Sequence, residues 1–220
     1  MRNSMAGRQD FDLAVNLFRN AFPGVQNPVD TFRLTQSRLR LEQPISTTTT
    51  SYRFPVLNNI QGQQSPFNTE VRLNMQDTFV VTHVGIYVGH PTSATDAAFP
   101  LMSYLNPFIF TNDAPMEVLY NGTMKVLLNN SQIIQNWPLA WHKRVPSTQQ
   151  TQAAAADSPL DEFDGSDYGL QPMQPFVLLS GSANIELTVN VPVAPSAADA
   201  FSRLIICFDG VLAQNSTVIQ

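Results

Sequence analysis

The chain has 220 residues, and only 13% of them are charged, about half the usual share of a soluble domain. Amides supply the missing polarity, with 17 Asn and 17 Gln against 12 basic and 17 acidic side chains. The absence of an apolar run near 18 residues excludes a membrane-spanning helix, and a single cysteine, Cys207, excludes an internal disulfide framework. The net charge of −5 argues against a protein that wraps nucleic acid, and no secretory leader is expected after Met1.

Residues 10–22 hold the one helical pattern of the sequence, and Asp10 suits its N-cap. Apolar side chains recur there at steps of three and four residues, at Phe11, Ala14, Val15, Phe18 and Phe22. Two interpretations remain open. The helix either packs on its own domain, or belongs to an arm (residues 1–30) that docks on a neighbouring subunit through Phe11, Val15, Phe18 and Phe22.

Beyond residue 30 the apolar period changes to two, which is typical of strands. The phase of the alternation slips between Phe32/Leu34 and Leu39/Leu41, which predicts a bulge or bend near Ser37. Further strands are predicted by the β-prone residues of 47–54 and by the alternation of Val71, Leu73 and Met75. Residues 78–88 are apolar on both faces, which indicates a central strand.

The strongest local signal in the second half is Asn121-Gly122, a dipeptide that favours the type I′ turn of a β-hairpin. It predicts paired strands over 116–120 and 123–128. Later strands are predicted over 176–180 and 184–191, and over 203–208 before Asp209-Gly210 turns the chain.

Eight or nine strands, one terminal helix and no strand–helix–strand rhythm predict an all-β fold, an antiparallel β-sandwich or barrel. We expect one domain over 31–220, with long connections at 89–115 and 137–174. Connections of this length usually carry function or contact something else. Their aromatic residues suit either a seam between subunits or stacking on sugars; they are Trp137, Trp141, Tyr104, Phe108 and Phe110.

No apparatus for catalysis or metal binding stands out. The histidines His83, His90 and His142 show no ligand spacing, so no zinc site is expected, and Cys207 suits a small buried hydrophobe. The sequence lacks a GxSxG elbow, a Walker loop and a GxGxxG motif. We therefore expect no enzyme, no catalytic residues and no cofactor, with a glycosidase carboxylate at Glu117 or Glu186 as a weak alternative.

Charge is distributed unevenly along the chain. Residues 1–60 carry seven Arg and four acids, hence +3, and the remainder carries five basic and 13 acidic residues, hence −8. A basic arm of this kind can make weak contact with nucleic acid or lipid headgroups, although random scatter explains three charges equally well. The acidic residues crowded over 157–167 are interpreted as a solvated loop, and ion binding there stays open; they are Asp157, Asp161, Glu162, Asp164 and Asp167.

Taken together, the strand sequence resembles that of the jelly-roll capsid (coat) proteins of icosahedral bacteriophages and other viruses. The resemblance is carried by 70–88 (EVRLNMQDTFVVTHVGIYV), 116–128 (MEVLYNGTMKVLL), 178–192 (LLSGSANIELTVNVP) and 203–212 (RLIICFDGVL). It implies eight strands in two four-stranded sheets, an N-terminal arm that reaches neighbours and loops that form inter-subunit contacts. A double jelly roll needs about sixteen strands, so a single roll fits better, with a compact double roll as the alternative.

The expected function is that of a structural virion protein, a self-assembling capsid or auxiliary capsid subunit. Its partners would be copies of itself and other virion proteins, and it would enter the virion after synthesis in the host cytoplasm. The scarcity of Lys, with two residues, agrees with a surface largely covered by partners. The alternative is a carbohydrate-binding or receptor-binding β-sandwich of a phage fibre, with Trp137 and Trp141 as sugar contacts.

Overall fold

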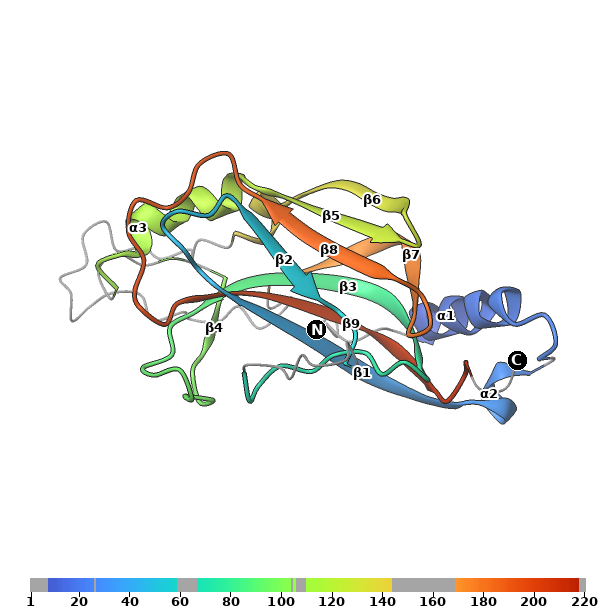
Figure 1. Cartoon of the computed structure of the whole chain (residues 1–220). Coiled ribbons are helices and arrows are strands. Elements are labelled where there is room, and N and C mark those ends of the chain that lie inside the picture. Colours follow the sequence, from blue (N-terminus) through green and yellow to red (C-terminus); the bar gives the residue numbers. More distant parts are fainter. Residues whose placement is uncertain are drawn as a thin grey trace.

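The computed structural model of the chain describes residues 8–25, 27–58, 67–103, 105, 110–143 and 169–217. In this part of the chain the strands form two antiparallel sheets packed face to face, an all-β sandwich as predicted (Figure 1). The longest helix and one short helix lie at one end of the sandwich, and another short helix lies at the other end. None of the described helices combines the length and the apolar character that crossing a membrane requires.

The described elements follow one another in chain order. They are α1 (Arg8–Ala21), α2 (Pro28–Thr31), β1 (Arg33–Pro44), β2 (Ser51–Pro55), β3 (Thr78–Gly89), β4 (Leu101–Met102), α3 (Asp113–Met116), the 3₁₀ helix η1 (Glu117–Asn121), β5 (Thr123–Leu128), β6 (Ser131–Pro138), the 3₁₀ helix η2 (Leu139–His142), β7 (Leu170–Ser180), β8 (Ile185–Asn190) and β9 (Arg203–Gln214).

The strand pairings are nested within one another along the sequence. The first sheet has the order β1-β9-β3, and the free edge of β3 pairs with β7 along one part and with β4 along another. The second sheet has the order β2-β8-β5-β6. Thus β1 pairs with β9, β2 with β8, β3 with β7 and β5 with β6, always antiparallel. The described chain is therefore one long hairpin whose arms alternate between two layers.

The main core lies between the two sheets, because each strand turns alternate side chains inward. The predicted central position of residues 78–88 is confirmed, since β3 is buried almost throughout and pairs along both edges. Large side chains that this core excludes from water include Leu41, Phe54, Ile86, Leu187 and Phe208. Burial of such side chains contributes about 1.5–3 kcal/mol each and is the main stabilising term of the sandwich.

The predicted bulge near Ser37 is wrong. Strand β1 pairs with β9 in one unbroken register from Arg33, opposite Gln214, to Pro44, opposite Arg203. Leu39 and Leu41 face the inter-sheet core, whereas Leu34 lies on the outer face of the same strand, against a second hydrophobic cluster. The apparent phase slip therefore reflects apolar partners on both faces of a regular strand.

Helix α1 provides the cover for that outer face. Ala14 and Phe18 are fully excluded from solvent and pack with Val80, Val211 and Ala213 of the first sheet. Helix and sheet are amphipathic partners, since the helix buries one apolar stripe and exposes the opposite side, including Leu13. The first of the two interpretations of the helix is the one seen here: α1 packs on its own domain.

The bulge of this sheet lies elsewhere, in β3. Between Val81 and His83 the pairing with β9 shifts by one residue, so that Thr82 is the extra residue. Gly210 faces this point, and a Cβ atom on it would lie 1.8 Å from the carbonyl oxygen of Val80. The prediction that Asp209-Gly210 turns the chain is therefore wrong, because β9 continues through both residues to Gln214. The glycine permits a close approach of two strands.

The predicted hairpin at Asn121-Gly122 is wrong as well. Residues 117–121 form the 3₁₀ helix η1, and Gly122 is extended, with φ −79° and ψ 175°. The β-hairpin of this region is β5–β6, and its turn residues Asn129 and Asn130 have φ values of 49° and 64°. Positive φ at both central positions is what a type I′ turn requires, and asparagine tolerates it better than most residues.

The alternating segment around Val71 and Leu73 does not form a strand. Each of these residues makes an isolated bridge, Val71 with Arg40 and Leu73 with Leu57. Leu73 enters the core, whereas Val71 and Met75 are about half exposed. The alternation comes from one inward side chain, Leu73, in an extended connection that runs beside the edge strand β1.

The long connection after β3 covers the remaining outer face of the first sheet. Phe99 packs with Tyr87, Ile205 and Cys207 in a third hydrophobic cluster. Burial raises the pKa of Tyr87, and raises that of the Cys207 thiol to about 12, so that this thiol stays protonated. The prediction that Cys207 behaves as a buried hydrophobe is confirmed.

A buried ion pair fastens two connections to this face. Glu42 is fully buried and accepts a hydrogen bond of 2.8 Å from Nη1 of Arg203, and its other oxygen lies 2.7 Å from Nε of Arg40. The hydroxyl of Thr69 donates to the same carboxylate. Arg203 also donates to the carbonyl oxygen of Ala94. The carboxylate of Glu42 thus holds the segment before β3 through Thr69, and the segment after β3 through Arg203.

We predict that Gly210→Ala lowers the free energy of unfolding by about 2–4 kcal/mol, because its Cβ would overlap the Val80 carbonyl and force β3 and β9 apart. Gly24→Ala is the matched control, since a Cβ there meets no atom within 4 Å. Urea denaturation of both variants measures the difference, and equal stability of the two would contradict the close approach at the bulge.

A second prediction concerns Glu42→Gln, which removes one charge from a buried pair and should cost about 3–5 kcal/mol of stability. The control is Glu186→Gln, which breaks the exposed pair between Glu186 and Arg53 and should cost about 0–1 kcal/mol. Thermal and chemical unfolding give both values. A loss at Glu42 no larger than that at Glu186 would show that the buried pair is not needed to hold the connections.

Candidate functional site

Three segments that are far apart in the sequence meet at one end of the sandwich, around His90. This residue directly follows β3, whose last residue Gly89 pairs with Arg203 at the start of β9. Asp113 is the first residue of α3, and Asp199 lies in the connection between β8 and β9. The register of β3 and β9 thus brings His90 beside the residues that precede Arg203.

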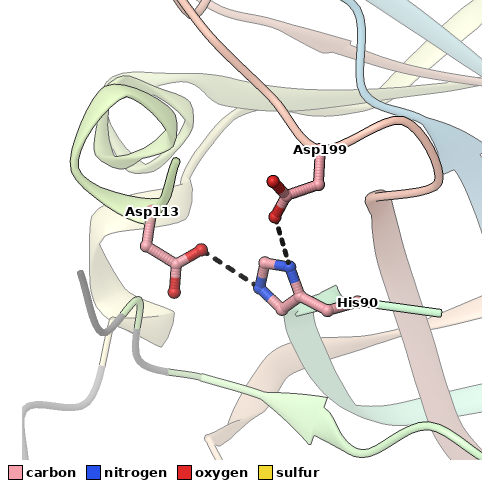
Figure 2. A group of neighbouring side chains, drawn as sticks. All are labelled: His90, Asp113 and Asp199. Carbon is pink, nitrogen blue, oxygen red and sulfur yellow. Dashed lines mark ion pairs between the residues drawn. The ribbon is translucent and has the colours of Figure 1, made fainter. Parts of the chain in front are cut away.

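The imidazole ring lies between the two carboxylates, one at each ring nitrogen (Figure 2). Nε2 of His90 is 3.1 Å from Oδ1 of Asp113, and Nδ1 is 3.4 Å from Oδ2 of Asp199. The hydroxyl of Ser202 lies 3.3 Å from the same Nδ1. Asn112 donates a hydrogen bond of 2.6 Å to the other oxygen of Asp199, which fixes the orientation of that carboxylate.

The cluster is enclosed by the protein. The side chains of His90 and Asp113 are 4% and 0% exposed, and Asp199, at 39%, is the member that reaches solvent. The ring of Phe110 stacks on the imidazole at 4.0 Å between centroids and 7° between planes. Charged groups in so dry a site interact more strongly than in water and require compensation.

The contact between His90 and Asp113 has an unusual geometry. Although their atoms are 3.1 Å apart, Nε2 makes no hydrogen bond among the described residues, because the approach falls outside the angular range of one. The carboxylate oxygen therefore lies beside the axis of the Nε2 lone pair and not on it. His90 offers one ring nitrogen, and Asp113 and Asp199 offer one carboxylate oxygen each. These three atoms lie within 4.8 Å of one another, so the group can hold a metal ion.

A hydrolytic function for this group is not supported by its exposure. Ser202, His90 and Asp113 do follow one another in contact, as in a nucleophile–base–acid arrangement. Ser202 is only 1% exposed, however, and a nucleophile must reach its substrate. The two glutamates considered from the sequence lie in ordinary ion pairs, Glu117 with Lys143 and Glu186 with Arg53.

The cluster was missed from the sequence because spacing rules search for ligands on one local segment. His90 has no histidine or cysteine at metal-binding distance along the chain, and its partners are two aspartates on other connections. A usable signal was the position of His90 at the end of a strand predicted to be central, where polar residues of several loops converge.

The second aromatic group is built around His142, which is fully buried. Nε1 of Trp137 donates a hydrogen bond of 2.7 Å to Nε2 of His142, so that this nitrogen carries no hydrogen. The hydrogen of the neutral ring is therefore on Nδ1, which donates to the carbonyl oxygen of Gly169 at 3.0 Å. Trp137 contacts Trp141 edge to face at 5.3 Å, and Trp141 is 56% exposed.

The residues predicted to contact other subunits differ in accessibility. Trp141 is exposed and Trp137 is half-buried, whereas Val15, Phe18 and Phe22 are buried, the two phenylalanines in the cluster between α1 and the first sheet. Phe11 is half-buried against the same cluster. Docking of this helix on a neighbour stays a prediction, and it would require α1 to leave the surface that it covers here.

Other predicted features are only partly within the described residues. Of the loop aromatics, Phe110 stacks on His90, whereas Tyr104 and Phe108 lie outside the described residues, as does the acidic segment 157–167. Within the basic region 1–60, three arginines are already paired with carboxylates: Arg38 with Asp209, Arg40 with Glu42 and Arg53 with Glu186. The pairing with Asp209 raises the pKa of Arg38. These pairs reduce the charge available for a polyanion.

Comparison with known proteins adds no assignment to this geometry. A scan against protein-family models found no match, and searches of curated proteins and of solved structures found no similar protein. The functional argument therefore depends on the strand order, the surface and the buried polar groups of the chain itself.

Proposed function

We propose that the chain is a jelly-roll structural subunit of a virion, a capsid or auxiliary capsid protein that assembles with copies of itself. The observation that carries the proposal is the nesting of four antiparallel pairs, β1·β9, β2·β8, β3·β7 and β5·β6, across two sheets. A jelly roll is a long hairpin wound in this way, with eight strands in two sheets, and the architecture recurs in viral coat and lectin domains. In this assignment β4 is an addition to the roll.

The number of described strands favours a single roll over the compact double roll. Nine strands form one pair of sheets around one inter-sheet core in the described residues, whereas two rolls would need about sixteen strands. Architecture alone does not define function, because the same sandwich hosts many activities. The surface must therefore supply the second argument.

Three of the exposed large apolar side chains lie on connections at the end of the sandwich that carries His90. Trp141 lies on η2, and Val193 and Phe201 lie on the connection between β8 and β9, with exposures of 56%, 62% and 41%. The two connections meet there, since Gly122 approaches Val191 and also accepts a hydrogen bond from the backbone of Leu139. Aromatic residues are enriched at protein contact sites, so the exposed Trp141 and Phe201 suit such a role.

The low charge content fits the same role. Symmetric copies bring identical surfaces together, so abundant Lys or Glu would place like charges side by side, whereas amides can both donate and accept. In the proposed mechanism the chain performs no chemistry: the connections at the His90 end pack against neighbouring subunits and other virion proteins. The basic region 1–60 would face packaged nucleic acid or lipid, and the protein would be made in the host cytoplasm.

A second candidate function is favoured by one observation, the exposure of Trp141 beside Trp137. Exposed indole rings bind the apolar faces of sugars, and jelly-roll domains also occur in lectins. In this alternative the chain is a carbohydrate-binding or receptor-binding module of a fibre. It predicts a small oligomer that binds glycans.

We predict that the purified chain forms particles much heavier than its 24.4 kDa monomer, because assembly is its proposed activity. Light scattering gives the mass, and negative-stain imaging shows whether shells or large rings are present. A monomer or small oligomer across a range of salt and protein concentrations, alone and with its co-expressed virion proteins, would contradict the coat proposal.

Trp141→Ala separates the two candidates. For a subunit contact, the substitution should reduce assembly at least tenfold at equal protein concentration, since a central interface tryptophan commonly contributes about 2 kcal/mol or more. The control is Val29→Ala, which removes a side chain of similar exposure, 48%, from α2 at the opposite end. For a lectin, Trp141→Ala would instead abolish binding on a glycan array and leave the mass unchanged.

A further inference from the structure

We propose that His90 and Asp113 bind a divalent transition-metal ion of the Zn²⁺ type, with Asp199 orienting the histidine ring from its other nitrogen. This inference does not depend on the capsid proposal, because it concerns a site inside one chain. The ion would connect the end of β3 with the start of α3, and Asp199 would support the histidine from the connection between β8 and β9.

The first argument is the separation of the two proposed ligand atoms. Zn²⁺ binds histidine nitrogen and carboxylate oxygen at about 2.0–2.2 Å, so neighbouring ligands of one ion lie roughly 3–3.5 Å apart. Nε2 of His90 and Oδ1 of Asp113 are 3.1 Å apart. The side chains are therefore already spaced as two ligands of one ion.

The second argument is the direction of Nε2. If the ring were a simple cation between two carboxylates, its Nε2–H would point at Asp113 and form a charge-assisted hydrogen bond. Nε2 is buried and forms no such bond, because Asp113 lies off its axis. A buried nitrogen without a hydrogen bond is costly, and an ion held by both atoms would satisfy it.

The third argument is the support on the opposite side of the ring. A histidine that binds metal through Nε2 usually donates its Nδ1–H to a carboxylate, which fixes the tautomer. Asp199 lies 3.4 Å from Nδ1 and is itself held by Asn112 at 2.6 Å, and the Ser202 hydroxyl lies 3.3 Å from the same Nδ1. The ring of Phe110 stacks on one face of the imidazole. The imidazole is thus supported at Nδ1 and on the face that Phe110 covers.

The chemistry of the ligand set indicates the class of ion. One imidazole nitrogen with carboxylate oxygen suits Zn²⁺ and related ions, whereas Ca²⁺ and Mg²⁺ prefer oxygen alone. We therefore expect the site to bind Zn²⁺ and to discriminate against Ca²⁺ and Mg²⁺.

The test uses the full-length chain, treated with EDTA and returned to metal-free buffer. Titration with ZnCl₂ by calorimetry should give one ion per chain, and metal analysis after gel filtration should confirm it. Binding should raise the melting temperature, since an ion that binds only the folded state stabilises it. MgCl₂ and CaCl₂ should leave the melting temperature unchanged.

Variants assign the site to its residues. His90→Ala should abolish Zn²⁺ binding, and Asp199→Asn should weaken it about 10–100-fold, the usual effect of losing such a supporting carboxylate. The matched control is His83→Ala, which should retain binding. His83 is a half-buried histidine of β3 that lies outside the cluster, and its Nδ1 lies 3.0 Å from the Thr82 hydroxyl.

The wild-type chain alone keeps the proposal falsifiable if a variant fails to fold. Co²⁺ replaces Zn²⁺ and should give visible absorption bands of a site with nitrogen and oxygen ligands. Wild-type protein that binds neither ion would overturn the proposal. Loss of binding in His83→Ala with retention in His90→Ala would overturn it equally. Each readout is independent of whether particles form.

Discussion

The structure depends on the burial of both faces of two long strands, β3 and β9. Their inner faces require a second sheet, and their outer faces require the cover that α1 and the connection through Phe99 provide. A polar group on such a surface must find a partner, because an unpaired buried charge is strongly destabilising. The Glu42–Arg203 pair meets that condition beneath the connections.

Much of the sandwich could be predicted from alternation, and the errors have a common cause. Asn121-Gly122 and Asp209-Gly210 were interpreted as turns because both dipeptides tolerate positive φ. Tolerance does not impose a conformation: Gly122 is extended, and Gly210 serves the close approach to Val80. The hairpin uses Asn129-Asn130, which gives a weaker local signal. Tertiary packing therefore decides which of the turn-prone dipeptides forms a turn.

The candidate site was beyond local patterns for a related reason. His90, Asp113 and Asp199 belong to three segments far apart in the sequence, and the pairing of Gly89 with Arg203 brings the segments of His90 and Asp199 together. A pattern rule can recognise ligands on one helix turn or one strand, whereas this cluster depends on a register between segments far apart in the chain. Trp141, by contrast, lies on a connection where the sequence predicts a subunit contact; its side chain is exposed, and the contact itself stays a prediction.

The nested strand order also determines how the chain can fold. Strands β5 and β6 are neighbours in sequence and can pair at once, whereas β1 must wait for β9, because Arg33 lies opposite Gln214. Contacts between such distant segments form slowly. The chain must first lose conformational entropy to bring the two segments together, and the favourable contacts form only afterwards. During synthesis on the ribosome, β1 therefore lacks β9 as a partner until the β9 segment has emerged. Until then the first sheet cannot be completed, because β9 is the strand that joins β1 to β3.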